Sequence, residues 1–211
     1  MSVPDRSIDP RLLASAEAEF LNKGFVKSDL KTICENAGIT TGAVYKRYKG
    51  KEDLFCALVD EIAERLEVFI EERSNIDFSK LLDKEIYDTW QMTYDSMLPL
   101  FRLLYKYRNT FTMLIDKAAG TKYENFNHDF VIKMSYAYEQ YYEESKKRGL
   151  AHAEVTRDEF HVLLSSFWTC ICEPFVHDMS WKQIEEHCRI VCRFFNWKEV
   201  IILRKGDVNF V

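Results

Sequence analysis

Glycine and proline are scarce in this sequence, with 7 and 4 copies in 211 residues. Valine, isoleucine and threonine do not alternate with polar residues over any long run, so the period of a half-buried β-strand is absent. Because helix breakers are few while 47% of the residues are apolar, the chain can bury a substantial core between helices. We therefore predict an all-α protein.

Long apolar runs are also missing. No stretch of about 18 apolar residues is present, so no membrane span is expected. The N-terminal sequence MSVPDRSIDPRLL lacks a basic region followed by an apolar one, so no signal peptide is expected either. These absences lead us to expect a cytoplasmic protein.

Known catalytic motifs are absent as well. The sequence holds no glycine-rich phosphate loop, no HExxH and no Gly-x-Ser-x-Gly, and its histidine spacing indicates no metal site. The cysteines form no CxxC pair, so we interpret them as buried thiols, with a metal or redox site as the less favoured alternative. They are Cys34, Cys56, Cys170, Cys172, Cys188 and Cys192. We predict neither an enzyme nor a bound metal or cofactor.

The net charge of −5 is unevenly distributed along the chain. Residues 1–55 hold nine Lys or Arg against eight Asp or Glu, whereas residues 56–211 hold twenty against twenty-six. Residues 40–51 contain four basic side chains and no acidic one. Because nucleic-acid affinity depends on local patches, the acidic total does not exclude a basic binding surface in this segment.

The segment 28–51, SDLKTICENAGITTGAVYKRYKGK, has the build of a helix-turn-helix that reads DNA. Its first helix carries apolar residues at helical spacing, and Gly38 can take the positive φ of the turn. Thr40 can cap the second helix, whose Val44 and Tyr48 form an inward pair. The apolar residues of the first helix are Leu30, Ile33, Cys34 and Ala37.

A helix is expected before this motif, with Leu13, Ala16 and Phe20 as its buried stripe. We expect Gly24 to end that helix and Ser28 to cap the next one.

A long helix should follow the motif, over about residues 51–72, because its apolar stripe continues for about five turns. This helix is longer than a three-helix domain needs, so we expect it to join two domains. These are an N-terminal helix-turn-helix domain over residues 1–50 and a helical regulatory and dimerisation domain over residues 51–211.

The N-terminal quarter resembles the DNA-binding domain of the tetracycline-repressor (TetR) family of bacterial transcriptional regulators. The matching segment is RLLASAEAEFLNKGFVKSDLKTICENAGITTGAVYKRYKGKEDLF. Its marks are Gly24-Phe25, Ala37-Gly38-Ile39-Thr40, Gly42, Val44-Tyr45, Tyr48 and Lys51-Glu52 before Leu54. Ser28, Arg47 and Gly50 stand where the family more often has other residues.

The resemblance implies roles for individual residues. Thr40, Thr41, Tyr45 and Lys51 match positions that commonly touch DNA phosphates in this family, and Ser28 is a further candidate. Lys46 and Arg47 can contact bases or phosphates. Gly42 and Ala43 are small enough to let the helix approach the groove floor. Core packing is the alternative for Tyr45.

Beyond residue 76 the sequence predicts helices at about 78–95, 97–117, 124–148, 157–178 and 180–198. Aromatic and Met side chains are abundant there, which suits an adaptable apolar pocket, and the resemblance implies an inducer-binding domain. A filled core is the alternative. The pocket candidates are Trp90, Tyr94, Met97, Phe101, Tyr105, Phe111, Phe130, Met134, Tyr138, Phe167 and Trp168; the polar groups considered for orienting a ligand are Asn109, Asp116, His128 and Tyr138.

The helices at 157–178 and 180–198 are expected to form a hairpin that is apolar on more than one face. In the TetR family such a pair forms a four-helix bundle with its dimer mate, which implies a homodimer; a buried hairpin in a monomer is the alternative.

The combined features lead to a functional hypothesis. We expect a DNA-binding transcriptional regulator that binds a palindromic operator as a homodimer and represses until a small apolar or aromatic ligand releases it. The alternative is a DNA-binding protein of the same fold that responds to a protein partner or acts as an activator, without a small-molecule inducer.

Overall fold

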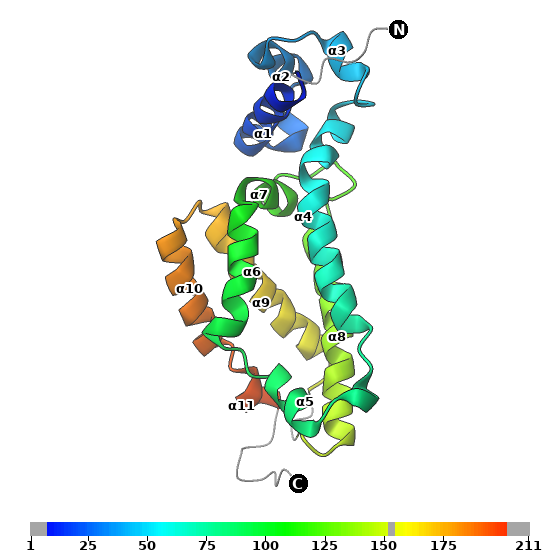
Figure 1. The fold of residues 1–211 in the computed structure, drawn as a ribbon, viewed down its shortest axis with the longest axis vertical. Helices are drawn as coiled ribbons and strands as arrows, with labels where there is room; N and C mark the ends of the chain where they lie inside the picture. Colours follow the sequence, from blue (N-terminus) through cyan, green and yellow to red (C-terminus); the bar gives the residue numbers. More distant parts are fainter. Residues whose placement is uncertain (1–7, 152–154, 202–211) are drawn as a thin grey trace. The chain divides into compact units, whose positions relative to one another are not determined.

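The computed structural model describes residues 8–151 and 155–201 (Figure 1). All regular elements in these ranges are helical, as predicted. In chain order they are α1 (Ile8–Lys27), α2 (Leu30–Ala37), α3 (Thr41–Tyr45), α4 (Lys51–Ser74), the 3-10 helix η1 (Phe78–Lys80), α5 (Asp83–Thr89), α6 (Tyr94–Lys106), α7 (Arg108–Asp116), α8 (Phe126–Lys147), α9 (Arg157–Val176), α10 (Trp181–Phe194) and α11 (Trp197–Ile201).

The chain divides into two compact units. Unit 1 comprises Met1–Arg65 and Tyr107–Phe126, and unit 2 comprises Leu66–Lys106 and Asn127–Val211. The division therefore falls inside α4 and differs from the boundary expected at residue 50. Within the described ranges, no helix combines the length and the apolar character that crossing a membrane requires.

Unit 1 is built on the apolar face of α1. Leu12, Ala16 and Phe20 are fully buried at a spacing of four residues, whereas Leu13, expected in this stripe, is only half-buried. The rings of Phe20 and Phe55 meet edge to face with centroids 5.0 Å apart, and Phe25 completes the cluster. This aromatic cluster joins α1 to the start of α4.

The helix ends of unit 1 follow the predicted pattern in part. Gly38 takes a φ of 67° where α2 ends, as expected. Gly24 takes a φ of 71° at a kink inside α1, which continues to Lys27, so Gly24 bends the helix where it was expected to end it. The Thr40 hydroxyl caps α3 by accepting the Ala43 amide at 3.3 Å. The cap of α2, however, is Asp29, whose carboxylate accepts the Thr32 amide at 3.0 Å. The prediction that Ser28 caps α2 is therefore wrong, and the Ser28 hydroxyl instead donates to the Phe25 carbonyl.

The expected helix over 97–117 is interrupted at Tyr107, and α7, which follows the break, belongs to unit 1. The Asn109 amide donates to Glu17 at 2.7 Å, which links α7 to α1. After α7, the Lys117 carbonyl accepts the Phe25 amide at 2.9 Å. Segments far apart in sequence therefore fold as one unit around the helix-turn-helix.

Unit 2 contains the three long helices expected at about 124–148, 157–178 and 180–198, which are α8, α9 and α10. The helix expected over 78–95 is replaced by η1 and α5. Thr93 and Ser96 exchange backbone-to-hydroxyl bonds of 3.0 and 3.2 Å and so cap α6 at Tyr94. The break between α5 and α6 thus precedes Pro99, which lies inside α6.

Buried hydrogen bonds cross the aromatic core of unit 2. The Trp90 indole donates to the Ser145 hydroxyl at 3.1 Å, and that hydroxyl donates to the Tyr141 carbonyl in the preceding turn of α8. Ser145 is fully buried. Its hydroxyl therefore satisfies an indole donor that would otherwise have no partner in an apolar interior.

We predict that Ser145→Ala lowers the free energy of unfolding by about 1–3 kcal/mol, because it leaves the buried Trp90 donor unsatisfied. Ser74→Ala is the matched control. Its hydroxyl makes the same type of bond, to the Ile70 carbonyl, but accepts no indole. Denaturant unfolding followed by circular dichroism measures both variants, and equal losses of stability would contradict the prediction.

Candidate nucleic-acid interface and apolar cavity

The short helix α3 buries one apolar side chain and exposes several polar ones. Val44 is fully buried, whereas Thr40, Thr41, Gly42 and Lys46 are exposed. Tyr45 is 61% exposed, so the alternative of core packing for this ring is wrong. The arrangement presents two hydroxyls, a phenol and an ammonium group on one small surface, all of them groups that donate hydrogen bonds to phosphate oxygens.

Arg47 and Ala43 lie closer to the body of unit 1. Both are half-buried, and the Arg47 guanidinium donates to the Ala43 carbonyl one turn earlier, at 3.1 Å. Contact between Arg47 and a base therefore remains a prediction that requires the guanidinium to turn away from its own helix.

Lys51 and Ser28 point inward. The Lys51 ammonium donates to the carbonyls of Phe25 and Ser28 at 2.7 and 2.9 Å, and it lies 4.4 Å from the centroid of the Phe25 ring. Ser28 is only 6% exposed. Both residues thus organise the segment between α1 and α2, a role that sequence reasoning missed because the Lys51 bonds span 23 to 26 residues.

Unit 2 encloses a cavity of about 540 Å³ whose walls come mainly from α4, α6, α8 and α9. Seven of the predicted pocket residues line it: Trp90, Met97, Phe130, Met134, Tyr138, Phe167 and Trp168. Four do not line it: Tyr94, Phe101, Tyr105 and Phe111. Further aromatic residues that the sequence did not single out for the pocket are Phe69, Tyr141, Phe160 and Trp197.

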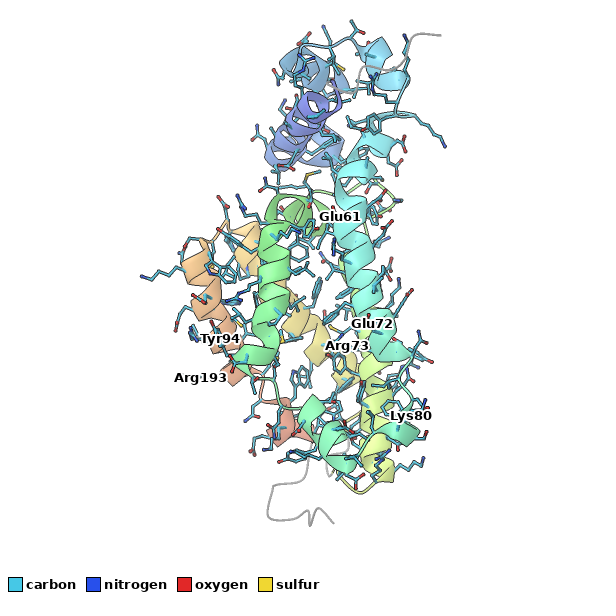
Figure 2. All side chains as sticks on the ribbon, in the orientation of Figure 1. Glu61, Glu72, Arg73, Lys80, Tyr94 and Arg193 are labelled. Atoms are coloured by element: carbon cyan, nitrogen blue, oxygen red, sulfur yellow. The ribbon has the colours of Figure 1, made fainter. Side chains whose placement is uncertain are left out.

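The four residues outside the cavity wall have other partners. The Tyr94 hydroxyl, labelled in Figure 2, donates to Glu185 at 2.9 Å and so joins α6 to α10. The ring of Tyr105 faces Trp181, and that of Phe101 faces His187. Phe111 is buried in unit 1. Aromatic composition alone cannot separate a cavity wall from a packed helix contact, because both use the same side chains.

Of the polar groups considered for orienting a ligand, only Tyr138 lines the cavity. Asp116 pairs with Lys117 at 2.7 Å, and Asn109 donates to Glu17, both within unit 1. His128 is exposed on α8. Asn109 and Asp116 therefore serve unit 1, and His128 lies on the surface of α8.

Two comparisons place the chain among known proteins. Residues 12–58 match the family model for bacterial regulatory proteins of the tetR family. Residues 12–58 therefore form a DNA-binding domain of the TetR type. The family consists of regulators that bind DNA, and it is non-enzymatic.

Several solved structures share the fold over nearly the whole chain. NalD of Pseudomonas aeruginosa, a repressor of a multidrug efflux pump, is 21% identical with a TM-score of 0.61, covering 93% of this chain and 96% of NalD. SmeT, solved in complex with triclosan, is 16% identical with a TM-score of 0.60, and the match covers 98% of this chain and 97% of SmeT. FadR of Bacillus subtilis, solved in complex with stearoyl-CoA, is 15% identical with a TM-score of 0.55, and the match covers 89% of this chain and 97% of FadR.

Two buried cysteines of this chain are weakly acidic. Burial raises the pKa of Cys188 to about 12 and raises the pKa of Cys172 well above its usual range. Both thiols are therefore protonated near neutral pH, which suits small apolar core groups. Cys170 and Cys192 are only half-buried.

Lys46 and Lys51 give a test that separates surface contact from structural support. We predict that Lys46→Met leaves the free energy of unfolding unchanged, weakens binding to all DNA sequences and reduces the slope of log affinity against log salt by about 1. Lys51→Met should instead lower the free energy of unfolding by about 1–3 kcal/mol, since it removes a charged donor from two carbonyls.

Fluorescence anisotropy over a salt series and thermal unfolding measure these two quantities. Lys31→Met, at an exposed position in α2, is the control and should change stability little. A Lys51→Met variant of full stability would contradict the structural role.

Proposed function

We propose that this TetR-family DNA-binding regulator is a ligand-responsive repressor. It binds a palindromic operator as a homodimer through α3 and the adjoining exposed groups, and a small apolar or aromatic molecule in the cavity lowers that affinity. The observation that carries this proposal is the cavity of about 540 Å³, walled by aromatic and Met side chains, in a chain that also holds a helix-turn-helix.

The size and chemistry of the cavity support a small-molecule ligand. Pockets of about 300–1,000 Å³ with mostly apolar walls are typical of sites for drug-sized ligands. Met97 and Met134 can adapt their side chains to different shapes. SmeT and FadR, which share the fold, have structures in complex with triclosan and stearoyl-CoA respectively, and NalD is a repressor.

The surface of α9 and α10 supports the homodimer. Each helix buries one apolar face in unit 2, yet α9 also exposes Val162 and Leu163, while α10 exposes Ile190 and Phe194. Phe194 is 77% exposed. Helices that are apolar on two faces need cover that a single copy does not supply, and a second copy of the same pair would supply it.

Helix α4 gives the proposal a mechanism. One continuous helix contributes to the helix-turn-helix unit up to Arg65 and to the cavity wall from Leu66 onward. In a dimer the two recognition helices must enter successive major grooves about 34–36 Å apart. A ligand that binds more tightly to a conformer with a different spacing would shift the protein away from DNA, by no more than its difference in affinity.

The test begins with selection of bound DNA from a random pool, which yields an operator. We expect a palindromic site, and we expect triclosan or a related apolar aromatic compound to stabilise the protein thermally and to weaken operator binding by about tenfold or more. A compound that stabilises the protein without changing operator affinity would overturn ligand-controlled release. Release by a protein partner alone would favour the alternative hypothesis.

We predict that Phe194→Glu converts the dimer into a monomer and weakens operator binding, because a carboxylate cannot be buried in an apolar interface without a partner. Val68→Glu, on an apolar side chain of α4 that is 52% exposed, is the control and should leave the dimer intact. Light scattering after size exclusion measures the mass, and a dimeric Phe194→Glu variant would place the interface elsewhere.

A further inference from the structure

Three charged residues line the cavity, and they differ in exposure. Glu72 and Asp88 are exposed, so their carboxylates are solvated, whereas Arg73 is half-buried. Figure 2 labels Glu72 and Arg73 near the C-terminal end of α4. Arg73 is therefore the charged group that a molecule inside the cavity meets with the least competition from water.

The guanidinium of Arg73 is held against the wall. It donates to the Phe69 carbonyl at 2.9 Å, and its central carbon lies 3.6 Å from the centroid of the Phe69 ring. No carboxylate of the described residues forms an ion pair with it. Arginine carries five N–H donors, so this single bond to a carbonyl leaves most of them available to an acceptor.

Two tyrosine hydroxyls belong to the same wall. Tyr138 and Tyr141 line the cavity, and neither hydroxyl bonds another residue in the described part of the chain. Burial raises the pKa of Tyr141, and the positive charge of Arg73 opposes that rise, which is consistent with their proximity. The Gln140 amide donates to the Ser74 carbonyl at 3.3 Å and so holds this end of α4 against α8.

We propose that the ligand of this cavity is an amphipathic carboxylate. Its carboxylate accepts hydrogen bonds from the Arg73 guanidinium, with the hydroxyls of Tyr138 and Tyr141 as further donors, and its apolar body lies between the aromatic and Met walls. This inference rests on the proposed function, because it names the ligand class of the same cavity.

Charge complementarity favours this class over a lipophilic cation. A planar guanidinium matches a carboxylate through two parallel hydrogen bonds, and such charge-assisted bonds are stronger than neutral ones. A cationic ligand would place a second positive charge beside Arg73 in a half-buried site. The two carboxylates that could attract it, on Glu72 and Asp88, are exposed and already solvated.

The test compares three molecules with the same ten-carbon chain: decanoate, 1-decanol and decyltrimethylammonium. Titration calorimetry on the full chain at neutral pH, below micelle-forming concentrations, should show decanoate binding about tenfold or more tighter than each of the others. Equal or tighter binding of the alcohol or the cation overturns the inference, and so does a failure of all three to bind.

Variants assign the preference to Arg73. Arg73→Met keeps an apolar stem and should abolish the preference for decanoate over decanol while leaving decanol binding unchanged. Arg73→Lys should keep part of the preference. Glu71→Gln, at an exposed position of α4 outside the cavity wall, is the control and should keep all of it. A full preference in Arg73→Met would overturn the assignment; circular dichroism and thermal unfolding verify that the variant folds.

The two proposals fail separately. If decanoate binds in an Arg73-dependent manner but operator affinity does not change, ligand-controlled release is wrong and the ligand class stands. If only neutral or cationic molecules bind and these release the operator, the proposed function stands and the carboxylate class is wrong.

Discussion

The connection between α1 and α2 in unit 1 depends on the hydrogen bonds that the Lys51 ammonium group donates. This group donates to the carbonyls of Phe25 and Ser28, which lie between the kink of α1 at Gly24 and the start of α2. The partial negative charge of these carbonyls favours a cation, and the Phe25 carbonyl also accepts the Ser28 amide and hydroxyl. One side chain at the start of α4 thereby fixes the turn from which the whole helix-turn-helix extends.

Local signals in the sequence predicted the helix-turn-helix well. Gly38 and Thr40 act within four residues of their own position, and the structure confirms both. Interactions between distant residues could not be read in the same way. The roles of Lys51, of Asn109 with Glu17 and of the break at Tyr107 all depend on which segments meet after folding, and helical periodicity does not contain that information.

The cavity in unit 2 could also be predicted only in part from the sequence. Aromatic and Met composition indicated that unit 2 could hold an adaptable pocket, and most of the candidates do line one. Tyr94, Phe101 and Tyr105 could not be told apart from them, because their separation depends on contacts with α10. Arg73 was not predicted to line the cavity, because a charged residue near the end of a long helix normally faces solvent.

Helix α3 has only five residues, too few to be stable as an isolated helix in water. Its conformation is therefore maintained by the burial of Val44 and by the Thr40 cap. The surface through which we propose that the protein reads DNA therefore depends for its stability on the core around Phe20. A genetic screen for lost operator binding would thus recover substitutions deep inside unit 1 alongside those at the surface, and affinity alone would not distinguish the two kinds.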